Sequence, residues 1–172
     1  MKDEEFKQKG LKMILDVTCG SRQIWFNKKE PHTIYCDRRK EEYIVETSNG
    51  GTKKIIINPD VVADFTSLPF EDNTFNLVIF DPPHAKQINE NSLLYKEYTD
   101  LRGDWHTMLK KGFEECMRVL KVNGTLIFKW SDVHYSTREV INTIGTEPLF
   151  GHRSGKKMNT HWLCFMKFAT KE

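Results

Sequence analysis

The sequence lacks long hydrophobic runs and clusters of metal-binding side chains. No apolar stretch approaches the roughly 18 residues that a membrane-spanning helix requires, and the charged residues 1–17 contain no apolar core of the kind found in signal peptides. The 4 cysteines are scattered without a CxxC pair, so we expect reduced thiols in a cytoplasmic protein. The 6 histidines lie far apart in the sequence, and we expect no metal site.

An excess of charge of one sign is also lacking. Lys and Arg number 26 against 24 Asp and Glu, the net charge is +2 and the pI is about 8.3. Composition alone therefore does not indicate a nucleic-acid partner. With 172 residues, 38% of them hydrophobic, and no repeat or linker, the chain is expected to form one domain, residues 1–172, with a sizeable core.

Short apolar runs recur along the chain, with polar or helix-like stretches between them. The runs are continuous rather than alternating, which is typical of strands that are covered on both faces of a parallel sheet. We expect strands at residues 12–17, 32–37, 60–65, 75–81, 124–130 and 161–168.

Two helices are expected in the second half of the chain. Residues 105–121 place apolar side chains such as Leu109 and Phe113 on one face. A second helix at 137–144 follows Ser136 and Glu139, the spacing of a capping box, and ends at Gly145.

A hairpin is expected in place of the second crossover helix. Within residues 43–58, two β-prone runs flank Asn49-Gly50-Gly51, a strong turn signal. The fold prediction is therefore α/β: a doubly wound, Rossmann-like, mostly parallel sheet with a small β-hairpin insertion at 43–58.

Acidic residues stand at or just after the ends of four expected strands: Asp16, Asp37, Asp64 and Asp81. Ligands of such sheets bind at the carboxyl ends of the strands. Asp37 follows Asp16 by 21 residues (37 − 16), close to the spacing of about 20 at which an acid on the second strand binds ribose hydroxyls. The loop after the first strand, DVTCGSRQ, contains small residues that let the backbone approach a ligand.

These segments together resemble the class I S-adenosylmethionine-dependent methyltransferases. ILDVTCGS is similar to the first motif of that family, TIYCD to its ribose-binding acid, ADFTSLPFEDNTFNLVIFD to its third and fourth motifs, and MRVLKVNGTLIF to its helix, turn and fifth strand. The resemblance covers about residues 13–130 and extends to the final β-hairpin. It implies a seven-stranded sheet with an antiparallel last strand and S-adenosyl-L-methionine as cofactor.

The resemblance also implies a set of cofactor-binding residues: Asp16, Thr18, Cys19, Gly20, Ser21, Asp37, Arg38, Asp64, Phe65 and Asp81. The first acid would lie near the cofactor's ammonium, the second would accept from the ribose hydroxyls, and the loop amides would pack against methionine and ribose. Arg38 would line the adenine, which Asp64 would bind and Phe65 would cover.

Each of these positions also has a purely structural alternative. Asp16 or Asp64 taken alone is often a helix cap or a solvated turn, and Cys19 is a space-filling residue rather than a nucleophile. Thr18 and Arg22 stand where the family usually has glycine, so the loop is closer to the version found in nucleic-acid amino-methyltransferases. A nicotinamide-binding fold would have GxGxxG after the first strand, which this chain lacks.

The tetrapeptide DPPH, residues 81–84, resembles the [DNS]-P-P-[YFWH] motif of amino-methyltransferases. Those enzymes methylate a planar nitrogen whose lone pair is delocalised, so two acceptors must hold its N–H groups. The Asp81 carboxylate and the Pro82 carbonyl suit this task, and Pro83 restricts Pro82 to extended geometry. His84 offers a flat ring for stacking, or alternatively takes up a proton.

Further residues are expected on the substrate side. The polar loop 85–104, which contains Tyr95 and Tyr98, is expected to cover the site as a lid, with loose surface structure as the alternative. Trp130 and Ser131 end the fifth strand and border the pocket. The turn between the last two strands contributes Arg153, Lys156 and Lys157, which either contact phosphates or form a solvated basic turn.

The sequence therefore predicts an S-adenosylmethionine-dependent methyltransferase of a planar amino nitrogen, an exocyclic amine of a nucleobase in RNA or DNA. Methylation of a protein amide or a small molecule is the first alternative. The second is a catalytically silent fold that binds nucleic acid or a partner. Sequence-specific readers of duplex DNA in this family usually carry a separate recognition domain. These 172 residues leave no room for one, which favours structured RNA, a recruited partner or a smaller substrate.

Overall fold

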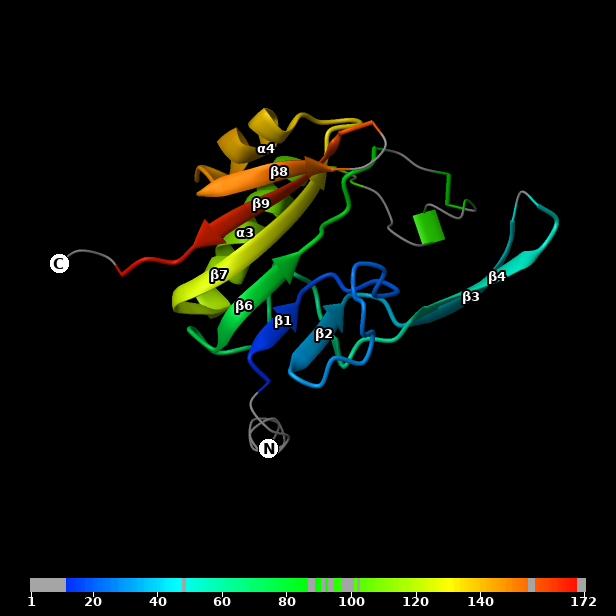
Figure 1. The fold of residues 1–172 in the computed structure, drawn as a ribbon, viewed down its shortest axis with the longest axis horizontal. Helices are drawn as coiled ribbons and strands as arrows, with labels where there is room; N and C mark the ends of the chain where they lie inside the picture. Colours follow the sequence, from blue (N-terminus) through cyan, green and yellow to red (C-terminus); the bar gives the residue numbers. More distant parts are fainter. Residues whose placement is uncertain are drawn as a thin grey trace.

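Seven strands form one sheet in the order β5-β2-β1-β6-β7-β9-β8 (Figure 1). The computed structural model describes residues 12–47, 49–86, 89–90, 92, 95–96, 101, 103–154 and 157–169. In chain order the strands of this sheet are β1 (Ile14–Asp16), β2 (Thr33–Asp37), β5 (Val61–Val62), β6 (Phe75–Phe80), β7 (Leu120–Ser131), β8 (Phe150–Ser154) and β9 (Thr160–Met166). The first five pair in parallel, and β9 is antiparallel to both of its neighbours. The predicted sheet is confirmed.

Strands form where the apolar runs were expected, and local polar contacts set their ends. All five residues of β2 are buried, as its continuous apolar run requires. The strand β5 is shorter than the predicted 60–65, because the Asp64 carboxylate accepts hydrogen bonds from the amide and hydroxyl of Thr66 and turns the chain.

Two helices, α3 (Trp105–Val119) and α4 (Thr137–Ile144), pack on the same face of the sheet (Figure 1). The α4 caps are as predicted: the Ser136 hydroxyl accepts from the Glu139 amide, and Gly145 is left-handed. The helix α3 ends two residues before the predicted 121. Leu120 is already extended and pairs with Phe75, so β7 begins directly after the helix.

A separate antiparallel hairpin replaces the helix between β2 and β5. Its strands, β3 (Glu41–Glu46) and β4 (Thr52–Ile57), pair along their whole length and extend away from the sheet in Figure 1. The hairpin prediction is confirmed. Residues 17–32, between β1 and β2, form turns and bends with no helix.

The core lies between the sheet and the two helices. Apolar side chains of β6 and β7, such as Phe80 and Phe128, meet Leu109 and Phe113 of α3 there. The helix approaches the sheet closely at Gly112, where a Cβ atom would lie 2.4 Å from the Phe65 ring. All 4 cysteines are buried and free, and within the described residues no helix has the length and apolar character needed to cross a membrane.

Candidate functional site

Three acidic side chains meet at the carboxyl ends of the central strands. Asp16 ends β1, Asp37 ends β2 and Asp81 directly follows β6. Two hydrogen bonds connect their loops: the Asp81 amide donates to Thr18 Oγ1 (3.0 Å), and the Gly20 amide donates to Asp37 Oδ2 (2.9 Å). The structure thus places these predicted residues together.

Asp16 is a buried carboxyl group with neutral partners. The side chain is 1% exposed, and it accepts from the Trp25 indole (2.7 Å) and from the Thr18 amide (3.3 Å). Burial raises its pKa to about 7, and the negative charges of Asp81 and Asp37 act in the same direction. Trp25 was not predicted, because nothing in the sequence of its loop signals this contact.

Asp37 is bound by Arg39, a partner that was not predicted. The Arg39 amide and Nε donate to Asp37 Oδ1 at 3.0 and 3.3 Å, while Arg38 is exposed. Arg39 also donates to the Lys96 carbonyl (3.1 Å), which brings the loop after β6 next to this acid. The placement of Arg38 at the adenine stays a prediction.

Backbone amides of the loop after β1 donate hydrogen bonds to β2. The Cys19 amide donates to the Cys36 carbonyl (2.8 Å), and the Gly20 amide binds Asp37. Burial raises the pKa of the Cys19 thiol, so Cys19 fills space and is not a nucleophile. Ser21 is partly exposed beside them.

Arg22 occupies a backbone position that favours glycine. Its φ is 57°, in the left-handed region where a side chain is strained. Contacts of the guanidinium offset that strain: it donates to the carbonyls of Lys28 (2.7 Å) and Asn58 (2.8 Å) and lies 3.6 Å from the centre of the Tyr35 ring. This explains how the loop accommodates an arginine where related loops have glycine.

The expected adenine-side residues lie near β5 and make local contacts. Asp64 is exposed and closes the turn with Thr66. The Phe65 ring is buried in the core, 5.3 Å from the ring of Phe80. Their roles at the cofactor stay predictions.

Asp81 forms an ion pair that was not predicted. Lys129 of β7 lies with Nζ 2.5 Å from Asp81 Oδ2, and the two side chains are 15% and 9% exposed. Asp81 Oδ1 is buried and accepts no hydrogen bond from any described residue. A signal was present in the sequence, since a lysine between Phe128 and Trp130 interrupts a buried strand.

The remainder of the DPPH segment lies against aromatic side chains. His84 Nδ1 is 3.3 Å from the Pro82 carbonyl, and its ring lies edge-on to Trp130 at 6.0 Å. Burial lowers the pKa of His84, an effect that the nearby charge of Asp81 opposes. Trp130 is 0% exposed, and its indole N–H donates to the Tyr135 carbonyl. Its fixed ring packs against the His84 ring on the side that faces the core.

The described part of the loop 85–104 is anchored at both ends. The Leu101 amide donates to the Ala85 carbonyl (2.8 Å), and Lys86 pairs with Leu101. Tyr95 donates its amide to Ser92 Oγ. Tyr98 lies outside the described residues, and the lid stays a prediction.

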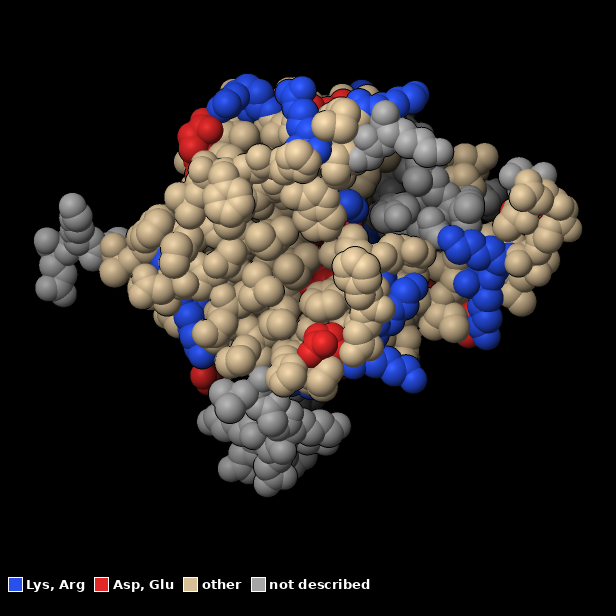
Figure 2. Space-filling model, in the orientation of Figure 1, with Lys and Arg blue, Asp and Glu red and all other residues tan. Residues whose placement is uncertain are grey.

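The basic turn between β8 and β9 lies at the same edge of the sheet as the acids. Arg153 and Lys157 are exposed there, Thr160 pairs with Ser131 at the end of β7, and Lys156 lies outside the described residues. Figure 2 shows Lys and Arg side chains along the edge formed by α4 and β8, and others around the hairpin.

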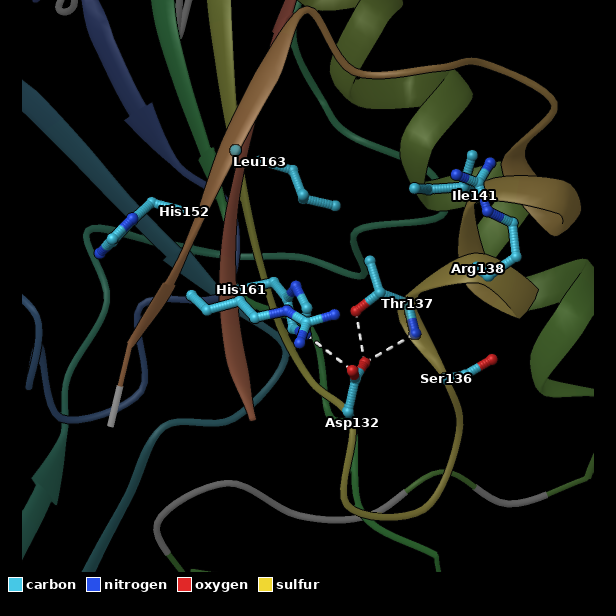
Figure 3. Close-up of a pocket in the computed structure, with 10 residues that line it drawn as sticks. Asp132, Ser136, Thr137, Arg138, Ile141, His152, His161 and Leu163 are labelled. Atoms are coloured by element: carbon cyan, nitrogen blue, oxygen red, sulfur yellow. Dashed lines mark hydrogen bonds and ion pairs between the residues drawn. The ribbon is translucent and has the colours of Figure 1, made fainter. Parts of the chain in front are cut away.

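A separate hollow of about 420 Å³ lies between α4, β8 and β9 (Figure 3). In its wall, Asp132 accepts from the Thr137 amide (2.6 Å) and lies 2.7 Å from His161 Nε2. Burial acts to raise the pKa of Asp132, but these hydrogen bonds hold it below its usual value. None of the lining residues belongs to the acid cluster, so the hollow is distinct from the site at Asp16, Asp37 and Asp81.

Metal ligation finds no support in the described part of the chain, where no three His, Cys, Asp or Glu side chains are grouped closely enough to hold an ion.

Solved structures share this fold. No protein-family model matches the sequence, and no curated protein matches it significantly. A structure of the PH0226 protein from Pyrococcus horikoshii OT3 is similar with a TM-score of 0.59 at 15% identity, over 95% of this chain and 84% of that one.

Two structures described as methyltransferases are similar as well. The N-methyltransferase NodS from Bradyrhizobium japonicum WM9 has a TM-score of 0.57 at 11% identity, covering 95% of this chain and 90% of that one. A SAM-dependent methyltransferase from Leishmania major has a TM-score of 0.51 at 13% identity, covering 91% of this chain and 65% of that one. At these identities the likeness shows the architecture alone: the chain shares the Rossmann-like α/β fold of these structures.

Proposed function

We propose that the protein is an S-adenosylmethionine-dependent methyltransferase that acts on a planar amino nitrogen, an exocyclic amine of a nucleobase in RNA or DNA. One observation carries the proposal: Asp81, at the strand ends where Asp16 and Asp37 also lie, has a buried carboxylate oxygen that accepts no hydrogen bond from the described residues, and Pro82 follows it directly in the chain. The fold shared with methyltransferases, one of them an N-methyltransferase, supports the reaction class.

The acid cluster suits the cofactor. Asp16 is buried with two neutral donors, so a cation would complete its surroundings, and the cofactor's ammonium is such a cation. Asp37 follows β2 at the place where an acid binds ribose hydroxyls. The further cofactor contacts in the proposal are those predicted from the sequence: Thr18, Cys19, Gly20, Ser21, Arg38, Asp64 and Phe65.

The DPPH segment would hold the amine. Asp81 Oδ1 and the Pro82 carbonyl are two acceptors for the two N–H groups, and together they direct the nitrogen lone pair away from themselves. Pro83 fixes the backbone that presents the carbonyl. Burial lowers the pKa of His84 and so favours its neutral ring, which suits stacking on a base better than taking up a proton.

Orientation and electrostatics are what these residues contribute to the reaction. Bound S-adenosylmethionine would supply a methyl group activated by its sulfonium, so that the amine lone pair could form the N–C bond while the electrons of the broken C–S bond remained on sulfur. The surplus proton on nitrogen passes to water. No covalent intermediate with the protein is required.

Nucleic acid is the proposed substrate class because basic residues lie at the same end of the sheet as the acid cluster. Arg153 and Lys157, with the predicted contribution of Lys156, lie at the strand-end edge and would contact phosphates. Tyr95 is the proposed aromatic contribution to the substrate side, whereas the predicted contact of Trp130 with substrate is not proposed further, because Trp130 is fully buried and packs against His84. Arg153→Ala is expected to reduce the salt dependence of RNA binding by about one counterion. An unchanged slope would remove Arg153 from the interface.

The test is methyl transfer from labelled S-adenosylmethionine to separate pools of total RNA, denatured DNA, protein and small molecules. Label in RNA or DNA, recovered as an N-methylated base, is the expected result. Label in the protein pool or in the small-molecule pool would show that the substrate is a protein or a small molecule and not a nucleobase. If no pool gains label, calorimetry with S-adenosylhomocysteine tests whether the protein is a catalytically silent fold. A silent fold that had lost its cofactor site would show no binding.

A further inference from the structure

We propose that Lys129 is a positioning residue for Asp81: it holds Oδ2 of the carboxylate so that Oδ1 faces the amine of the substrate. The inference rests on the proposed amine methylation and deepens it. It assigns a function to a residue that neither the motif nor the loops around the cofactor site contain.

The sheet itself places Lys129 opposite Asp81. The strands β6 and β7 pair in parallel with Ile79 opposite Ile127 and Phe80 opposite Phe128. Continuing that register by one residue brings Lys129 beside Asp81, where the Nζ–Oδ2 distance is 2.5 Å. The position of the ammonium is therefore fixed by backbone pairing and not by a flexible loop.

The ion pair is not needed to join the two strands. Their backbone ladder already reaches Phe80 and Phe128, and Phe128 is fully buried in the core. Placing a lysine and a carboxylate in a largely buried site is costly unless both are well paired. A charged pair at this strand end is therefore better explained by what it does to Asp81 than by strand cohesion.

The backbone amide and one carboxylate oxygen of Asp81 have partners, and the other carboxylate oxygen has none among the described residues. Its amide donates to Thr18 Oγ1 (3.0 Å), its Oδ2 contacts Lys129, and its Oδ1 is buried without a hydrogen bond from the described residues. A buried acceptor that lacks a donor is destabilising, because it has lost its hydrogen bonds to water without replacing them. An N–H group of the substrate would satisfy this oxygen, and Lys129 prevents the carboxylate from rotating to use both oxygens elsewhere.

Lys129 has a second neighbour that keeps it in place. Its Nζ lies 5.8 Å from the centre of the Trp162 ring on β9, within the range of a cation–π contact. The ammonium is thus held between an aromatic face and the carboxylate, which limits the orientations that Asp81 can adopt.

Four variants test the proposal: Lys129→Met, which removes the donor; Lys129→Gln, which keeps a neutral donor; Lys129→Arg, which keeps the charge; and Lys121→Met as the matched control. Lys121 lies on the same strand and donates to Asn76 at the distant end. The readouts are kcat and KM with labelled S-adenosylmethionine and total RNA, the Kd of S-adenosylhomocysteine, thermal unfolding, and the crystal structure of each folded variant.

We expect Lys129→Met to lower kcat by about 100-fold, with the Kd of S-adenosylhomocysteine changed by less than about 3-fold. Lys129→Gln and Lys129→Arg should recover part of the loss, and Lys121→Met should have no effect. In the Lys129→Met crystal structure the Asp81 carboxylate should have turned. If that variant does not fold, the Lys129→Gln structure and kinetics decide in its place.

Two results would overturn the proposal. The first is a Lys129→Met structure in which the Asp81 carboxylate keeps its wild-type orientation. The second is a Lys129→Met protein that unfolds at a much lower temperature and binds S-adenosylhomocysteine about 100-fold more weakly, because the loss of kcat would then reflect general damage to the fold. If the wild-type protein transfers no methyl group to any pool, the proposed function fails. The crystal structures then still decide whether Lys129 orients Asp81.

Discussion

The two acids at the centre of the site, Asp16 and Asp81, have opposite surroundings. Asp16 is bound by the neutral donors Trp25 and Thr18, and its pKa is raised to about 7, chiefly by burial. Asp81 already has a cationic partner in Lys129, and its other oxygen accepts no hydrogen bond within the described part of the chain. The difference suggests two kinds of ligand. Asp16 is suited to a cation such as the cofactor's ammonium, and Asp81 to a neutral N–H donor such as an amine.

Replacing Asp81 should produce the largest effect and separate the two acids. Asp81→Ala removes one of the two acceptors for the amine, so we expect kcat to fall at least about 100-fold, while the Kd of S-adenosylhomocysteine changes by less than about 3-fold. Methyl transfer and calorimetry measure the two quantities. Asp72→Ala, at an exposed acid paired with Arg118, is the control. Normal turnover by Asp81→Ala would show that the assigned chemistry is wrong.

Replacing Asp16 should have the complementary effect. Asp16→Asn keeps a side-chain oxygen for Trp25 but removes the negative charge, so we expect the cofactor Kd to rise about 10- to 100-fold, the equivalent of a lost charged hydrogen bond of about 1.5–3 kcal/mol. If Asp16→Asn bound the cofactor as tightly as the wild type, the ammonium would have to lie elsewhere.

The same variant should be more stable than the wild type when no cofactor is bound. A carboxyl group whose folded pKa is raised contributes stability that is fully present below its unfolded pKa, near 4, and is lost as the pH rises through about 7. An asparagine side chain cannot ionise, so Asp16→Asn should have the higher melting temperature at pH 8 and lose this advantage at pH 4. An identical pH dependence of unfolding in both proteins would contradict the assignment.

Cofactor affinity should depend on pH in the wild type. Because the Asp16 carboxyl must ionise to bind an ammonium, we expect affinity to fall up to about tenfold between pH 8 and pH 6. Calorimetry in buffers of different ionisation enthalpy should also detect proton release near pH 6. Asp16→Asn provides the reference, and its affinity should vary little over the same interval.

The smallest expected effect concerns the indole that donates to Asp16. Trp25→Phe keeps an aromatic ring against Tyr35, whose centre lies 5.2 Å from that of Trp25, but removes the N–H donor. Losing one donor should raise the pKa of Asp16 further and weaken cofactor binding at pH 7 by about 3- to 10-fold. A larger loss at pH 8 than at pH 6 would indicate that Trp25 acts through packing instead.

The sequence was sufficient to predict where β1, β2 and β6 end and where the hairpin is inserted. Asp16, Asp37 and Asp81 could be placed because the carboxyl ends of parallel strands share an edge, and the hairpin because Asn49-Gly50-Gly51 is a local turn signal. The caps of α4 follow from Ser136 and Gly145 in the same way. All of these depend on short-range patterns.

The partners of the acids could not be predicted, because they depend on three-dimensional arrangement. Trp25 reaches Asp16 from a loop without regular structure, and Arg39 rather than its neighbour Arg38 turns toward Asp37. The pairing of Lys129 with Asp81 requires the register of β6 and β7. The sequence shows a lysine within an apolar strand, but it does not show that its ammonium lies 2.5 Å from Asp81.

A crystal structure with S-adenosylmethionine bound would show whether the acids at the strand ends hold the methyl donor. We expect the donor across the ends of β1, β2 and β6, with its ammonium at Asp16, its ribose at Asp37 and its methyl group facing the space beside Asp81 Oδ1. A donor bound in the hollow between α4 and β8, or one whose methyl group points away from Asp81, would contradict this expectation.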